Sequence, residues 1–121
     1  MTQALSSQKP ADYKAVMDLA DKLNLDRDRI RAILGISESS QFRYEKNNPT
    51  LKPNLGDRWS RLIRTVELAQ DILEDEAEVR RWLSAPKSTL DNQCPLDLLT
   101  TDAGTRQVEQ ILLQASYGVF A

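Results

Sequence analysis

The side chains in this sequence that could do chemistry are mainly hydrogen-bonding groups, because the usual catalytic sets are incomplete. The 121 residues include no histidine and a single cysteine, Cys94. Histidine is the commonest general base and a usual zinc ligand, so Ser-His and Cys-His nucleophile pairs and ordinary zinc sites are excluded. A carboxylate pair remains possible in principle, but the acidic residues fall on the expected solvent faces of helices. We therefore expect no enzyme activity, no metal and no cofactor.

The polar residues best suited to binding lie between positions 37 and 46, in the second of two short predicted helices. The first of these helices begins after the N-cap residue Asp26 and ends at Gly35. Ser37 then caps the second helix. Two short helices joined by a tight turn that contains glycine are typical of a helix-turn-helix motif.

In a helix-turn-helix, the second helix enters the major groove of DNA with its N-terminal residues foremost. We therefore expect DNA contacts from the polar residues of this helix, which are Ser39, Ser40, Gln41, Arg43 and Lys46. Gln41 suits adenine, and Arg43 suits guanine or a phosphate. Phe42 is expected to face inward and, with Trp59 and Trp82, to belong to the core.

The charge of the chain is uneven along its length. Residues 1–53 carry nine Lys/Arg and seven Asp/Glu, whereas residues 54–121 carry seven and eleven. This mild asymmetry permits a nucleic-acid contact at the front of the chain without requiring one. Because phosphate neutralisation dominates affinity, we expect DNA binding to need a dimer, or added charge from Lys52 and the amino-terminal arm.

The apolar periodicity predicts an all-α fold with a helix-turn-helix bundle, a long central helix and a small C-terminal helical domain. Apolar residues share one face of the central helix from Leu55 to Leu73. Thr100 or Thr101 is expected to cap the final helix, with Gly104 allowing a close approach between helices. We divide the chain into a flexible arm (1–10), a helix-turn-helix region (11–54) and the central helix with the C-terminal domain (55–121).

The end of the chain is unusually apolar, since it reads Ser116-Tyr117-Gly118-Val119-Phe120-Ala121. Chain ends are commonly polar and frayed, so this one is expected to need an apolar surface. In the helix before it, Val108, Ile111 and Leu112 are expected to point inward. The lone cysteine and the lack of a signal-like apolar run predict a cytoplasmic protein with no membrane partner.

Two stretches of the sequence carry a resemblance to a known family. The second half resembles the toxin-binding domain shared by Xre, MbcA and ParS antitoxins, on the residues Trp82-Leu83, Pro86, Leu90, Pro95-Leu96-Asp97-Leu98-Leu99, Thr101, Gly104, Val108, Leu112 and Tyr117-Gly118-Val119. The stretch from Leu19 to Arg43 is similar to the Xre-like helix-turn-helix of the same proteins. The family usually has a glycine, often two, between the positions of Leu90 and Pro95, where this chain has Asp91-Asn92-Gln93-Cys94. Asn92 can adopt the positive φ that glycine supplies.

The resemblance implies an antitoxin of a type II toxin-antitoxin pair that covers the active site of a RES-domain toxin acting on NAD. It also implies operon autoregulation through promoter DNA and self-association as a homodimer. Its toxin-binding residues would be Arg106, Tyr117, Gly118, Val119, Phe120 and Ala121. Two other functions remain open: a stand-alone helix-turn-helix regulator whose C-terminal domain only dimerises, and an interaction protein whose helix-turn-helix no longer binds DNA.

Overall fold

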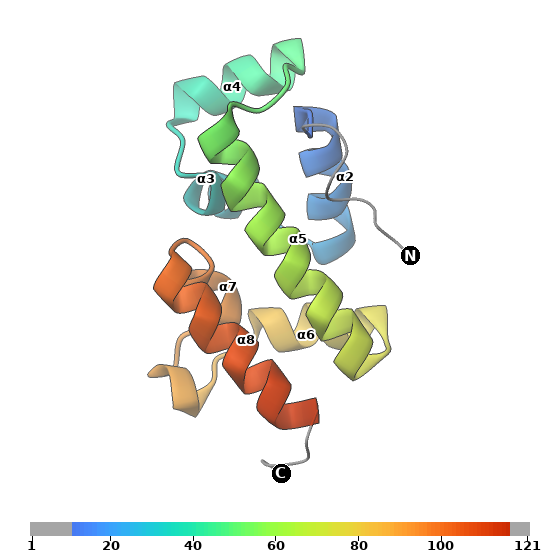
Figure 1. Cartoon of the computed structure of the whole chain (residues 1–121). Helices are drawn as coiled ribbons and strands as arrows, with labels where there is room; N and C mark the ends of the chain where they lie inside the picture. Colours follow the sequence, from blue (N-terminus) through green and yellow to red (C-terminus); the bar gives the residue numbers. More distant parts are fainter. Residues whose placement is uncertain (1–10, 117–121) are drawn as a thin grey trace. The chain divides into compact units, whose positions relative to one another are not determined.

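The computed structural model describes residues 11–116, which form helices and two isolated β-bridges but no strand. The elements, in chain order, are α2 (Tyr13–Leu23), α3 (Arg27–Leu34), α4 (Glu38–Asn47), α5 (Pro53–Leu73), α6 (Glu76–Ser84), the 3-10 turn η1 (Ser88–Leu90), α7 (Pro95–Leu98) and α8 (Asp102–Ser116) (Figure 1). The predicted all-α fold with a long central helix is confirmed.

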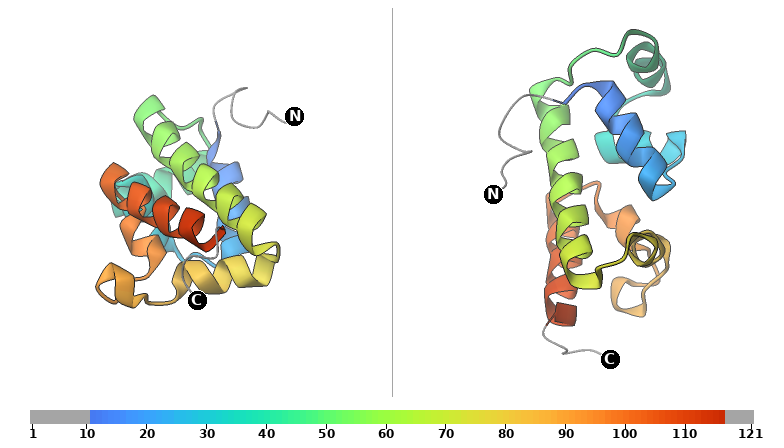
Figure 2. Two further views of the ribbon diagram at one scale, coloured as in Figure 1. Left: turned by 60° about the horizontal axis from the view of Figure 1, so that its bottom comes forward. Right: turned by 90° about the vertical axis from the view of Figure 1, so that its right-hand side faces the viewer.

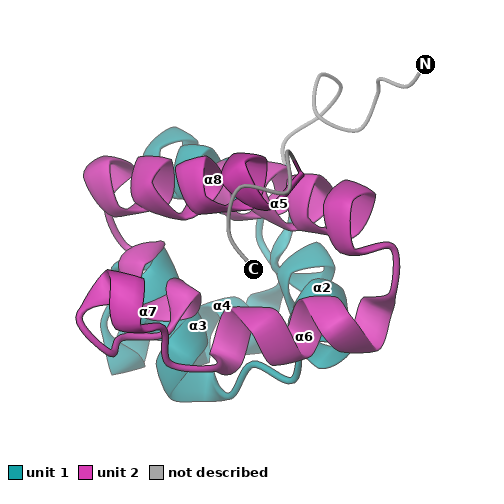
Figure 3. Cartoon of the chain, turned by 90° about the horizontal axis from the view of Figure 1, so that it is seen from below, with its two compact units in different colours: residues 1–60 teal, residues 61–121 magenta. Residues whose placement is uncertain are grey.

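The chain divides into two compact units, residues 1–60 and residues 61–121, which Figure 3 shows in different colours. The division falls inside α5, so that helix contributes side chains to both cores. Trp59 is buried in the first unit, and Leu62 and Ala69 are buried in the second.

In the first unit, short polar residues set the helix boundaries. The side chain of Asp12 accepts from the Ala15 N–H at 3.0 Å, and that of Asp26 accepts from the Arg29 N–H at 2.8 Å. Asn24, Gly35 and Asn48 adopt left-handed backbone conformations at the C-terminal ends of α2, α3 and α4. These are the N-cap and C-cap roles that such residues favour.

The core of the first unit is built from α2, α3 and the start of α5. Its buried apolar side chains are Tyr13, Val16, Ala20, Leu23, Ile30, Ile33, Leu34, Leu51, Leu55 and Trp59. The loop between α4 and α5 forms two backbone hydrogen bonds with the start of α2. The Tyr13 N–H donates to the Pro49 carbonyl, and the Leu51 N–H donates to the Ala11 carbonyl. The residues directly before α2 lie beside this loop, as Figure 2 shows, and Asp12 forms an isolated β-bridge with Thr50.

In the second unit, α8 lies beside the end of α5, while α6 and α7 lie together on the other side (Figure 3). Two ion pairs join α5 to α8, Arg61 with Asp102 and Arg64 with Glu109. The buried apolar side chains are Leu62, Ala69, Val79, Leu83, Leu90, Cys94, Leu96, Leu99, Val108 and Leu112. Val108 and Leu112 therefore point inward as predicted, while Ile111 is half-buried.

The start of α8 depends on a close backbone contact at Gly104. The Gly104 N–H donates to the Thr101 hydroxyl at 2.9 Å, which identifies Thr101 as the capping residue. A Cβ added at Gly104 would lie 2.9 Å from the Leu98 carbonyl carbon and closer still to its oxygen. Only glycine therefore fits at this position, and the predicted close approach is confirmed.

Candidate functional site

The turn between α3 and α4 has the local geometry expected of a helix-turn-helix. Gly35 ends α3 with φ +69° and donates its N–H to the Arg31 carbonyl at 2.7 Å. After Ile36, Ser37 starts α4 by accepting from the Ser40 N–H at 3.1 Å. Three residues therefore separate the two helices, and α4 occupies the position of a recognition helix.

The inward face of α4 is polar and carries Gln41, which is fully buried. Its amide nitrogen donates to the Arg27 carbonyl at 2.9 Å and to the Tyr13 hydroxyl at 3.4 Å. Its amide oxygen accepts from the Arg31 guanidinium at 2.9 Å. The prediction that Gln41 contacts adenine is therefore wrong, because all of these interactions hold the amide inside the first unit.

Tyr13 and Tyr44 complete the contact between α2 and α4. Their rings stack with centroids 5.5 Å apart and an interplanar angle of 21°. Burial raises the pKa of the Tyr13 hydroxyl above its ordinary value, although its hydrogen bond with Gln41 opposes the shift. The hydroxyl therefore stays protonated at neutral pH and can serve as a partner for the Gln41 amide.

The outward face of α4 carries four of the predicted DNA-contacting residues. Ser39, Arg43 and Lys46 are exposed, and Ser40 is half-buried with its hydroxyl accepting from Arg43 at 3.2 Å. Phe42 also lies on the exposed side, with 62% of its surface accessible. The prediction that Phe42 faces inward is wrong. Gln41 faces the polar groups of α2 and α3, and successive residues of an α-helix are rotated by about 100°, so Phe42 is turned toward the exposed side.

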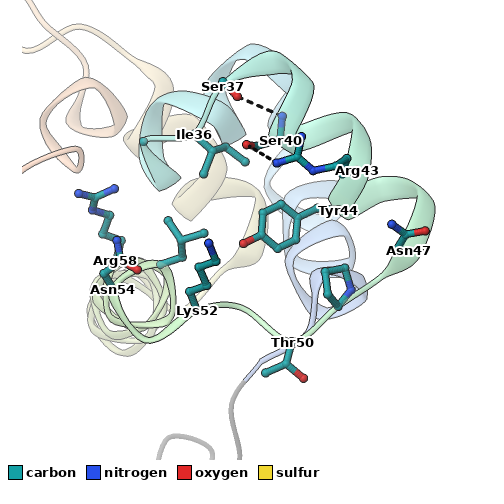
Figure 4. A pocket seen from close by; sticks show the side chains of 13 residues that line it. Ile36, Ser37, Ser40, Arg43, Tyr44, Asn47, Thr50, Lys52, Asn54 and Arg58 are labelled. Atoms are coloured by element: carbon teal, nitrogen blue, oxygen red, sulfur yellow. Dashed lines mark hydrogen bonds between the residues drawn. The ribbon is translucent and has the colours of Figure 1, made fainter.

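A pocket of about 640 Å³ lies between α4 and the start of α5 within the first unit (Figure 4). Its three basic residues are Arg43 from α4, Lys52 from the loop before α5, and Arg58 from α5. In Figure 4, Arg43 and Lys52 lie on opposite sides of the Tyr44 ring. No Asp or Glu is found among the described residues that line the pocket, so its lining carries positive charge.

Arg58 lies, with Arg61 and Arg64, in a basic set on the long helix that the sequence leaves open to phosphate contact, partner binding or solvation. Its Nη1 donates to the Leu34 carbonyl at 2.7 Å, which places a positive charge at the C-terminal end of α3. In the sequence, Arg58 follows the loop that contains Pro49 and Pro53. Its hydrogen-bond partner Leu34 lies 24 residues earlier, so a local sequence pattern does not predict this contact.

Glu38 and Glu45 of α4 lie close to Arg43 and Lys46 in the sequence, and a carboxylate there would weaken an anion site. Glu38 is exposed, whereas Glu45 is half-buried. The Glu45 carboxylate accepts from Arg27 Nε at 2.8 Å and from Arg27 Nη2 at 2.9 Å. This bidentate hydrogen bonding lowers the pKa of Glu45 and raises that of Arg27. The charge of Glu45 is therefore balanced within the fold, which leaves the positive charges of Arg43 and Lys46 with less local opposition.

In the second unit, the loop from Lys87 to Cys94 closes without the glycine that the resemblance leads one to expect. Asp91 and Asn92 adopt positive φ values of 57° and 64°. The Asn92 N–H donates to the Lys87 carbonyl, and the Lys87 N–H donates to that of Gln93. The predicted left-handed conformation of Asn92 is confirmed, and Asp91 adds a second.

The surface of α8 is the other candidate site. Arg106 is exposed, as are Gln107, Gln110 and Gln114. A hollow of about 660 Å³ lies between these glutamines and the stretch from Pro86 to Leu90. At its edge, Lys87 Nζ lies 4.7 Å from the ring centroid of the half-buried Trp82, and burial lowers the pKa of Lys87. The predicted toxin-binding residues Tyr117, Gly118, Val119, Phe120 and Ala121 lie outside the described residues.

Two searches bear on other kinds of site. Within residues 11–116, no group of three or more His, Cys, Asp or Glu residues is placed to hold a metal ion. None of the helices described is both long enough and apolar enough to cross a membrane.

These features define a helix-turn-helix protein that carries a second compact helical unit. Residues 6–64 match the antitoxin Xre-like helix-turn-helix domain, and residues 68–118 match the antitoxin Xre/MbcA/ParS C-terminal toxin-binding domain. The chain therefore contains both of these antitoxin domains, in that order. Its resemblance to them is confirmed.

One curated relative is antitoxin Xre of Pseudomonas putida. The two sequences are 36% identical over 76 residues, which is 63% of this chain and 47% of the relative. The chain thus spans about half the length of the curated relative that it matches.

Proposed function

We propose that this protein is the antitoxin of a type II toxin-antitoxin pair, which binds its toxin through the second unit. The observation that carries the proposal is the presence of both matched domains in one chain, with the described part of the second match, residues 68–116, lying within one compact unit. The proposed toxin is a RES-domain enzyme acting on NAD, and the antitoxin acts by covering the mouth of its active site. The protein itself does no chemistry.

The proposed toxin contact begins on the exposed face of α8 and continues into the last five residues. Arg106, Gln110 and Leu113 follow one another at spacings of four and three, so they share one side of the helix. Leu113 is 44% exposed, which gives this face an apolar group beside an arginine. Buried aromatic and arginine side chains carry much of the energy of protein interfaces, and the tail supplies Tyr117 and Phe120.

Deleting residues 117–121 is expected to abolish neutralisation of the toxin, because it removes the apolar anchors of the interface. The measurement is growth of cells that co-express the neighbouring open reading frame with either the full chain or the truncated chain. Circular dichroism of the purified proteins should show the same helix content. Deleting residues 2–9 is the matched control at the other end of the chain and should leave protection intact.

Two results would count against the antitoxin assignment. One is a neighbouring gene product that is harmless when expressed alone. The other is a gene product that remains toxic when the full chain is co-expressed. Full protection by a stable truncated protein would instead reject only the anchor role of the tail.

The same protein is proposed to regulate its own operon by binding promoter DNA through α4. The observation that favours this second activity is the basic pocket beside α4, where Arg43, Lys52 and Arg58 occur and no carboxylate is found among the described lining residues. The positive charge of this pocket suits contact with DNA phosphates, which supply most of the non-specific affinity of DNA-binding proteins. Self-association would place two such surfaces on one operator.

Replacing Lys52 by alanine is expected to weaken binding to every DNA sequence by a similar factor and to reduce the slope of log K against log salt by about 1. Fluorescence anisotropy on the promoter fragment, repeated over a range of salt concentrations, measures both quantities. Lys22→Ala, at a basic position on α2 outside the pocket, is the control and should leave the slope unchanged. An unaltered slope in Lys52→Ala would remove Lys52 from the DNA contact.

A further inference from the structure

Phe42 is a large apolar side chain that the first unit does not bury. It is 62% exposed, although it follows the fully buried Gln41. On the helix surface its neighbours are Glu38 and Ser39, four and three residues before it, and Glu45 and Lys46, three and four residues after it. The aromatic ring therefore stands on the outward side of α4, among the residues that are candidates for DNA contact.

The place of Phe42 on the second helix of the helix-turn-helix indicates what kind of partner would cover it, because this is the helix that enters the major groove in such motifs. Of the charged residues nearest the ring, Lys46 is exposed and basic, Glu38 is exposed and acidic, and the carboxylate of Glu45 is paired with Arg27. The pocket with Lys52 and Arg58 lies along a different side of α4. The partner expected at Phe42 is therefore a groove that admits a helix, that is bordered by negative charge and that offers an apolar group.

The major groove of B-DNA has these properties. Phosphates border it, and the C5-methyl group of thymine is the apolar group that base pairs present within it, a group that Phe side chains can contact. We propose that Phe42 contacts the C5-methyl group of a thymine in the operator and so makes the protein prefer T·A at that position. The inference rests on the proposed DNA binding by α4, and it replaces the amide-to-adenine contact predicted for Gln41.

The test compares thymine with deoxyuridine, which lacks only the methyl group. Each thymine of the promoter fragment is replaced singly, and the affinities of the wild-type protein and of Phe42→Ala are measured. At one position per half-site, the wild-type protein should bind the deoxyuridine DNA about fourfold more weakly, in line with the free energy of burying one methyl-sized group. Phe42→Ala should lose affinity for the thymine DNA and should not distinguish the two DNAs.

Controls separate this contact from other uses of the ring. Gln70→Ala is an exposed substitution on α5 in the second unit and should keep the full preference for thymine. The melting temperature of Phe42→Ala should match that of the wild type, because the ring is exposed. Light scattering should show the same oligomeric state for both proteins.

The outcomes that overturn the inference are distinct. Equal preference for thymine in the wild type and Phe42→Ala would show that Phe42 does not contact the methyl group, and an absence of any preference would show the same. A change of oligomeric state in Phe42→Ala would identify a second copy of the chain as the group that covers the ring. If the wild-type protein bound no promoter DNA at any salt concentration, the proposed DNA binding would fail as well, whereas neutralisation of the toxin could persist.

Discussion

Alanine at position 104 is expected to lower the free energy of unfolding of the second unit by about 2 kcal/mol or more, as overpacking against rigid neighbours does. The new Cβ would collide with the carbonyl group of Leu98, which belongs to the backbone and cannot rotate away. Alanine is intrinsically the better helix former by about 1 kcal/mol, so a measured loss would mean that the steric cost exceeds this gain.

Gly56→Ala is the matched control, since Gly56 also lies within a helix but, apart from the nearby backbone of that helix, no atom of the described residues lies within 4 Å of an added Cβ. We expect it to stabilise the protein by about 0.4 to 1 kcal/mol, because alanine restricts the unfolded chain. Urea unfolding followed by tryptophan fluorescence measures both variants, with Trp59 reporting on the first unit and Trp82 on the second. A Gly104→Ala protein as stable as the wild type would contradict the close contact with Leu98.

Leucine at position 41 is expected to lower the free energy of unfolding of the first unit by about 2 to 4 kcal/mol, because it leaves buried polar groups without partners. The Arg27 carbonyl, the Tyr13 hydroxyl and the Arg31 guanidinium would each lose a hydrogen bond to Gln41. The leucine side chain is similar in size, so loss of packing volume contributes little. Thermal and urea unfolding give the change directly.

The control for this prediction is Ser39→Ala, an exposed substitution on the same helix that should change stability by less than about 0.5 kcal/mol. Well below its melting temperature, Gln41→Leu should retain the base preferences of the wild type, since the side chain faces inward. If Gln41→Leu instead kept its stability and lost discrimination at one base pair, Gln41 would be a DNA contact after all.

The helix boundaries could be predicted because the residues that set them act on their nearest neighbours. Asp26 and Ser37 cap the backbone three residues ahead of them, as their chemistry requires. Gly104 and Thr101 were also predictable, because they lie within one turn of each other and of the start of α8. In each of these cases the sequence window that determines the structure is short.

The orientation of α4 could not be predicted, because hydrophobicity points to the wrong face. Phe42 is more apolar than Gln41, yet the groups that α4 meets are the carbonyl of Arg27 and the hydroxyl of Tyr13. These partners lie 14 and 28 residues from Gln41 in the chain. The basic pocket was also not predictable from local sequence, because Arg43, Lys52 and Arg58 come from separate elements that only the folded structure brings together.

Helices α2, α3 and α4 each have a polar residue at the start and a left-handed residue at the end. The pairs are Asp12 with Asn24, Asp26 with Gly35, and Ser37 with Asn48. Such contacts close only small loops of chain, and helical proteins dominated by local contacts fold within about microseconds to milliseconds. We therefore expect these three helices to form rapidly, so that a newly synthesised or briefly unfolded molecule regains this part of its structure before slower encounters with other molecules take place.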